Sequence, residues 1–124
     1  MKFEEIFIEI MTLEPDADMV EFMRRKSGKL RFPIYLNDDI YKVGIEVLDL
    51  SARASNCLDQ AGYTTVGKLV ENINKRDDLK KLRNCGEKTM DEIMESIFCY
   101  QYTQLKEEKK VKYIRRILEL NRGN

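Results

Sequence analysis

The chain has 124 residues, of which 43% are apolar, and its 22 basic and 22 acidic side chains leave no net charge. A chain of this length can bury a hydrophobic core without disulfides or metal ions. Zero net charge excludes the broad positive field of strong non-specific nucleic-acid binders, so any contact with nucleic acid must depend on a few well-placed residues.

Residue types that most enzymes and metal sites require are scarce in this sequence. It contains no histidine, and its three cysteines form no C-x-x-C pair, so a zinc site would need widely scattered thiolates. No phosphate-binding loop of the P-loop type and no nucleophile elbow occurs, and we expect neither catalysis nor a cofactor. The acidic N-terminus and the lack of a long apolar run predict a soluble cytoplasmic protein that does not enter a membrane.

The N-terminal third combines helical and extended patterns. Apolar residues at helical spacing predict a helix over residues 3–11 and a second short helix that ends near Gly28. The apolar faces of these helices favour core packing or the formation of a homodimer over a groove for a partner protein. Around Asn37-Asp38-Asp39, apolar and polar residues alternate, which predicts a short β-hairpin near residues 30–47 that would lie against the helices.

Helical patterns dominate from Leu48 onward, so the predicted fold class is mainly α, with helix-hairpin-helix-like packing. Helices are expected near residues 51–60, 65–74, 77–82 and 87–102. A final basic amphipathic helix is expected from 106 to 120. Its polar faces carry four basic side chains, Lys109, Lys112, Arg115 and Arg116.

Two of these helix starts gather polar groups. Ser51 is placed to cap a helix by accepting a backbone N–H, which puts Arg53 and Asn56 on neighbouring turns of the exposed face. The turn Asn84-Cys85-Gly86 leads into another helix. The first N–H groups of that helix have no intrahelical acceptor and would form a phosphate site beside Lys88-Thr89. An arginine and a phosphate site at two helix starts indicate DNA binding.

These residues resemble the C-terminal domain of the bacterial RNA polymerase alpha subunit. One matching motif is Arg53 followed by Asn56-Cys57-Leu58, and the other runs from Asn84 through Gly86, Lys88 and Thr89 to Glu92-Ile93. Between them, Gly62 fits a helix stop and Thr65 a helix cap. Asp59 and Glu87 stand where family members often carry lysine, which weakens the expected affinity for DNA.

The resemblance implies that the chain docks on double-stranded DNA, with Arg53 in an A/T-rich minor groove. The implied DNA-binding residues are Arg53, Asn56, Cys57, Asn84, Gly86, Lys88, Thr89 and Glu92. Cys57 and Glu92 belong to this set only because the matching family positions lie in the DNA-facing surface. From their charge, the four basic residues of the last helix are expected to add auxiliary phosphate contacts.

Several of these residues also have a purely structural interpretation. Gly86 fits a turn that needs a positive φ or a close backbone approach, and Glu92 is spaced to form an i, i+4 ion pair with Lys88. Cys57 and Cys85 fit small packing groups beneath the contact face.

The resemblance also supports a second function from a different class. The same fold would then serve as a protein-interaction module that mimics the alpha domain and binds sigma factor, a transcription activator or RNA polymerase. In 124 residues there is no room for the large N-terminal assembly domain of an alpha subunit, so we expect a free-standing protein. Its expected parts are an N-terminal extension (1–47), an alpha-C-terminal-domain-like DNA-binding domain (48–103) and a basic C-terminal helix (104–124).

Overall fold

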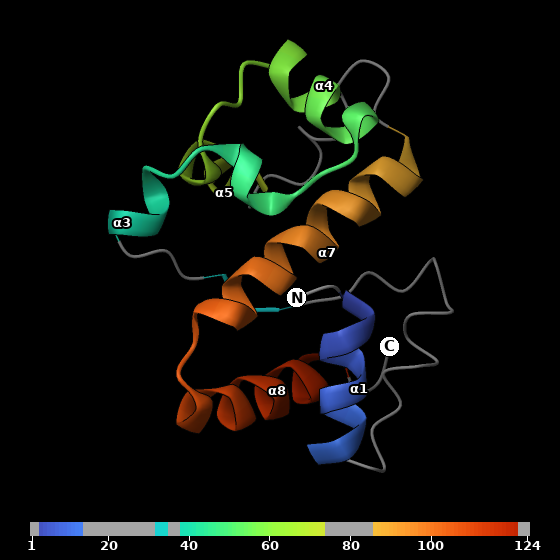
Figure 1. The fold of residues 1–124 in the computed structure, drawn as a ribbon, viewed down its shortest axis with the longest axis vertical. Helices are drawn as coiled ribbons and strands as arrows, with labels where there is room; N and C mark the ends of the chain where they lie inside the picture. Colours follow the sequence, from blue (N-terminus) through green and yellow to red (C-terminus); the bar gives the residue numbers. More distant parts are fainter. Residues whose placement is uncertain (1–2, 14–31, 35–37, 74–85, 122–124) are drawn as a thin grey trace. The chain divides into compact units, whose positions relative to one another are not determined.

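α-Helices form most of the regular structure in the described part of the chain, which confirms the mainly α fold class. The structure is a computed structural model that describes residues 3–13, 32–34, 38–73 and 86–121. The chain divides into two compact units, residues 1–33 with 98–124, and residues 34–97. We call them the terminal unit and the central unit. Figure 1 labels the α-helices of the two units.

The central unit contains α3 (Asp38–Tyr41), the 3₁₀ helix η1 (Ile45–Leu48), α4 (Ala52–Gln60), α5 (Val66–Ile73) and the first part of α7 (Glu87–Gln104). The terminal unit contains α1 (Phe3–Leu13), the rest of α7 and α8 (Glu107–Asn121). The helices predicted before Gly28 and over residues 77–82 lie outside the described residues. The boundaries 1–47, 48–103 and 104–124 remain a prediction about function.

Local signals at both ends of the α4–α5 connection account for its geometry. After α4, Gly62 adopts a φ of 84°, which is accessible to glycine without steric cost, and the N–H of Tyr63 donates to the carbonyl of Leu58 at 3.0 Å. The hydroxyl of Thr65 then accepts a hydrogen bond from the N–H of Lys68 at 3.3 Å and caps α5. The predicted glycine stop and threonine cap are both confirmed.

The second strand of the predicted hairpin does not form. Residues Ile45–Leu48 are a 3₁₀ helix, in which Ile45 and Leu48 are buried while Val47 stays 38% exposed. The alternation of apolar residues suggested a period of two, but the burial follows the i, i+3 spacing of a 3₁₀ turn. Gly44 instead forms an isolated antiparallel bridge with Thr65. This bridge joins the segment to the start of α5.

A close approach of α3 to α5 explains why residue 67 is glycine. A Cβ atom at Gly67 would lie 2.5 Å from the ring of Tyr41 and 2.6 Å from the carbonyl oxygen of that residue. The Tyr41 hydroxyl donates a hydrogen bond to the Glu71 carboxylate, and this bond raises the pKa of the Tyr41 phenol. Any larger residue at position 67 would push α3 away from α5.

Apolar residues from each element of the central unit except α3 fill its core. The buried hydrophobic residues are Ile45, Leu48, Ala54, Cys57, Leu58, Val66, Leu69, Val70, Met90, Ile93 and Ile97. They include Cys57, which confirms the prediction that this cysteine is a small packing group.

Aromatic rings form the centre of the terminal unit. The ring of Phe98 contacts Phe32 edge to face, with centroids 5.4 Å apart, and stacks on Tyr102 and Tyr113 at 6.2 Å each. Around these rings lie further buried residues, Ile6, Ile10, Cys99, Ile114, Ile117 and Leu118. The unit therefore has a hydrophobic core of its own.

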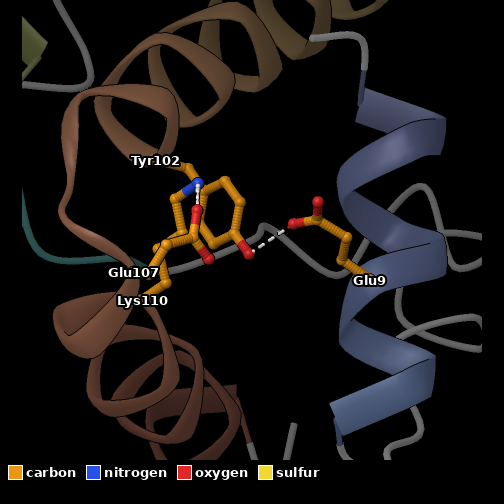
Figure 2. Close-up of polar contacts among 4 residues, drawn as sticks. All are labelled: Glu9, Tyr102, Glu107 and Lys110. Atoms are coloured by element: carbon orange, nitrogen blue, oxygen red, sulfur yellow. Dashed lines mark hydrogen bonds and ion pairs between the residues drawn. The ribbon is translucent and has the colours of Figure 1, made fainter.

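Polar contacts of Tyr102 link the helices of the terminal unit (Figure 2). Its hydroxyl donates to the Glu9 carboxylate of α1 at 2.7 Å, and its ring lies 5.0 Å from the ammonium of Lys110 in α8. Lys110 also pairs with Glu107 at 2.9 Å. Burial and the hydrogen bond to Glu9 raise the pKa of the Tyr102 phenol.

Candidate nucleic-acid interface

The start of α4 presents two polar side chains to solvent. The hydroxyl of Ser51 accepts a hydrogen bond from the N–H of Ala54 at 3.2 Å, which confirms the predicted N-cap. Behind this cap, the helix buries Ala54, Cys57 and Leu58. Because these buried residues fix the rotation of α4, Arg53 and Asn56 face outward and are both exposed.

The start of α7 presents backbone donors. The carbonyl of Gly86 accepts from the N–H of Met90 at 3.0 Å, so Gly86 is the residue that precedes the first helical turn. The N–H groups of the next three residues therefore have no acceptor within the helix, and the helix dipole adds partial positive charge there. The exposed side chain of Lys88 lies in the same turn. This combination suits an anion such as a phosphate.

Two structural explanations for Gly86 follow from the sequence, a positive φ and a close backbone approach. Neither is found in the described part of the chain. Its φ does not lie in the left-handed region, which among the glycines described here only Gly62 occupies. A Cβ atom added at Gly86 would meet nothing within 4 Å. Among the described residues, a side chain at this position would therefore meet no steric obstacle.

Glu92 joins the two helix starts. One oxygen of its carboxylate accepts from the backbone N–H of Ser51 at 2.6 Å, and the other accepts from the Ser51 hydroxyl at 2.7 Å. The predicted ion pair of Glu92 with Lys88 is therefore wrong, because both carboxylate oxygens are directed to the α4 cap. Lys88 lies about one turn before Glu92, and Arg53 is two positions after Ser51, so the bridge holds these functional groups in one region.

We call Arg53, Asn56, Gly86 and Lys88 the helix-start surface. All four residues belong to the central unit and are exposed. Comparison with protein-family models matches residues 36–97, half of the protein, to the C-terminal domain of the bacterial RNA polymerase alpha subunit. The chain belongs to this family. The matched residues include the whole helix-start surface and the bridge between Ser51 and Glu92.

Curated relatives of the protein are DNA-directed RNA polymerase alpha subunits. That of Clostridium kluyveri is 37% identical over 93 residues, which cover 75% of this chain and 27% of the subunit. That of Nitratiruptor sp. is 43% identical over 61 residues, which cover 49% of this chain and 18% of the subunit. The chain thus spans less than a third of the length of these relatives. No solved structure matches it.

Within this alpha C-terminal-domain fold, the remaining predicted site residues differ in accessibility. Cys57 is 3% exposed and Thr89 is 6% exposed, so their side chains lie beneath the surface, while Glu92 is half-buried. The residue Asn84 lies outside the described part of the chain. The four basic residues expected to add phosphate contacts, Lys109, Lys112, Arg115 and Arg116, are exposed on α8 in the terminal unit.

Sequence reasoning missed Ser51 as the partner of Glu92. The serine was predicted only as a cap, and the signal that a second group would bind it is weak. A helix cap offers an unpaired backbone N–H beside its hydroxyl, and a glutamate near another helix start is a suitable acceptor for both. Their separation of 41 residues leaves no spacing rule that links them.

The described residues also bear on metal sites and membrane spans. Among them, no group of three or more histidine, cysteine, aspartate or glutamate side chains is arranged to hold a metal ion. In the same part of the protein, no helix has the length and apolar character needed to cross a membrane.

Proposed function

We propose that the chain is a transcription-related DNA-binding module that docks on A/T-rich duplex DNA through the helix-start surface. Membership of the alpha C-terminal-domain family supports binding to DNA as the general role. The observation that carries the finer proposal is the bridge from Glu92 to Ser51, because it brings an exposed arginine and a helix N-terminus into one surface.

Each group of the surface has a distinct task in this proposal. A/T-rich tracts have a narrow minor groove with enhanced negative potential, and the guanidinium of Arg53 enters this groove. Asn56, Lys88 and the N–H groups at the start of α7 hold the flanking phosphates and fix the position of the arginine. Thr89 adds its backbone N–H, since its side chain is almost buried. The duplex is thus recognised mainly by its shape.

A direct test measures binding of the whole protein to an A/T-rich and a G/C-rich duplex of equal length at two salt concentrations. We expect tighter binding to the A/T-rich duplex at both, with overall affinity falling as salt rises because phosphate contacts release counterions. Equal affinity for the two duplexes would contradict groove recognition by Arg53.

Gly86→Ser is predicted to weaken DNA binding about tenfold, equivalent to about 1.4 kcal/mol, without lowering thermal stability. Serine is a better N-cap than most residues, and the fold has room for its Cβ, so the helix start should be retained or strengthened. The side chain would instead obstruct a phosphate that approaches the backbone. The measurements are fluorescence anisotropy with duplex DNA and thermal melting. Full affinity with an unchanged melting temperature would exclude this helix start from the interface.

Glu92→Ala is predicted to destabilise the protein by about 1–2 kcal/mol, the net value of hydrogen bonds to a charged group at a partly exposed site. It is also predicted to weaken DNA binding, because the α4 start that carries Arg53 loses its link to α7. Simple electrostatics predicts tighter DNA binding instead, because the variant lacks a negative charge that repels DNA. Urea unfolding and anisotropy test both effects, with the exposed Asp59→Ala as a charge-matched control. Tighter binding in both variants would exclude a positioning role for Glu92.

A protein-interaction module remains the second candidate function. Glu87 is the first residue of α7 and places an acidic residue type where a phosphate would be bound, and Asp59 is exposed at the end of α4. These charges favour a protein partner such as sigma factor, an activator or RNA polymerase. Binding to such a partner without any affinity for duplex DNA would support this function over the first.

A further inference from the structure

The core of the terminal unit is built by residues that lie on both sides of the central unit in the sequence. Ile6 and Ile10 come before the central unit, whereas Phe98, Tyr102 and Ile114 come after it, and all five are buried in one cluster. Every contact between the earlier and the later residues therefore closes a loop of the chain. That loop contains the whole central unit, about 64 residues.

The two points where the chain passes between the units lie side by side in the terminal unit. The chain leaves this unit after Pro33, whose carbonyl accepts from the amide of Gln101 at 2.6 Å and from the Tyr113 hydroxyl at 3.1 Å. It returns within α7 at Phe98, whose ring contacts that of Phe32 with centroids 5.4 Å apart. The folded terminal unit thus holds both ends of the central unit at one place. We call these five residues the end clasp.

Joining the two ends of a chain segment restricts its unfolded state far more than its folded state. An unfolded central unit with clasped ends would lose conformational freedom, as it would under a disulfide, whereas the folded unit already has its ends close together. The probability that the ends of a flexible chain meet falls with about the 3/2 power of its length. Taking about ten flexible residues as the effective tether of the folded unit, against about 64 when it is unfolded, the clasp favours the folded state about sixteenfold.

We propose that the terminal unit stabilises the central unit by holding its two ends together through the end clasp. The family model matches residues 36–97, so the terminal unit lies outside the matched residues, and this role is additional to the DNA contact proposed for them. The mechanism acts through chain connectivity and needs no contact between the surfaces of the two units. It is reciprocal, because a folded central unit must favour the folded terminal unit by the same factor. The helix-start surface itself is unchanged, so the clasp sets stability and not DNA preference.

The test lengthens and then cuts the connection between the units in the full-length protein. A flexible Gly-Ser linker of about 20 residues, with an internal protease site, is inserted directly after Ile34. Native-state hydrogen exchange then follows the slowest amides of α4 and α5, whose protection reports the opening of the central unit. By the same power law, this protection should fall about threefold in the uncut linker variant. It should fall about sixteenfold once the linker is cut, because the ends are then free.

Two further variants identify the clasp as the cause. The same linker appended at the C-terminus lies outside the loop and should leave the protection of α4 and α5 unchanged. Phe98→Ala opens the clasp from the terminal side, which the loss of protection of α8 amides in the same measurement verifies. It should lower the protection of α4 and α5 about sixteenfold in the intact chain and cause no further loss in the cut chain, because two ways of opening one clasp are not additive.

Two results would overturn the proposal. Unchanged protection of α4 and α5 in both the uncut and the cut linker variants would mean that the stability of the central unit does not depend on its ends being joined. A loss of protection in Phe98→Ala that neither linker variant reproduces would mean that the coupling depends on direct packing between the units. DNA enters none of these measurements, so failure of the clasp leaves the proposed function standing, and failure of the proposed function leaves the clasp standing.

Discussion

Replacing Arg53 with alanine is expected to abolish the preference for A/T-rich over G/C-rich duplex DNA while the fold stays intact. The side chain is exposed on α4, whose buried residues Ala54, Cys57 and Leu58 are not affected by its removal. The loss should amount to about 1–3 kcal/mol on the A/T-rich duplex, the usual value of a specific contact. Anisotropy titrations with both duplexes at one salt concentration measure it.

Two control variants give this experiment its meaning. Arg53→Lys keeps the charge but loses the planar guanidinium, which is less hydrated than an ammonium and easier to place in a narrow groove, so it should retain only part of the preference. Arg116→Ala removes an exposed arginine from α8 and should lower affinity for both duplexes equally. An Arg53→Ala variant that still favours A/T-rich DNA would remove the central step of the proposed function.

Phe98→Ala is expected to have the largest effect on stability. The ring is fully buried at the centre of the terminal unit, where it contacts Phe32, Tyr102 and Tyr113. Truncation of a buried phenylalanine costs about 3–5 kcal/mol, which approaches the whole stability of a small unit. Urea unfolding followed by circular dichroism should show a lower midpoint or a separate early transition.

The same variant tests whether the two units work separately. The central unit has its own buried core and contains the helix-start surface, so the A/T preference should persist in Phe98→Ala. The auxiliary phosphate contacts expected from α8 should weaken, because the buried side of this helix loses the ring against which the terminal core is built. Ile8→Ala is the matched control. Its side chain is 65% exposed, and its removal should change stability by no more than about 0.5 kcal/mol. Loss of the A/T preference together with the terminal unit would show that the units depend on each other.

Most helices in the described part of the protein were predictable from local patterns. Capping residues and apolar spacing act over a few residues, so the sequence alone located α4, α5, α7 and α8 to within a few positions. The same signals identified Ser51 and Thr65 as caps and Gly62 as a helix stop. The motif residues Arg53 and Lys88 were identified by their resemblance to the family, and the structure places both on the surface.

Where two local patterns compete, the tertiary structure decided the outcome. Val43, Ile45 and Val47 alternate as in a strand, yet Ile45–Leu48 forms a 3₁₀ turn because that turn buries Ile45 and Leu48 together. On α8, Tyr113 is buried and donates a hydrogen bond to the carbonyl of Pro33 at 3.1 Å. A tyrosine fits a surface or a core equally well, and only its partners settle which.

The sequence by itself determined that this protein is helical and where its helices start, and it identified the residues of an alpha C-terminal-domain surface. It did not determine how those residues are held together. Glu92 meets Ser51 across 41 residues, and Tyr102 meets Glu9 across 93 residues. Such pairs form only when folding brings distant helices into hydrogen-bonding range, because spacing along a sequence constrains neighbours within a few turns. The link between the two helix starts is therefore a property of the tertiary structure.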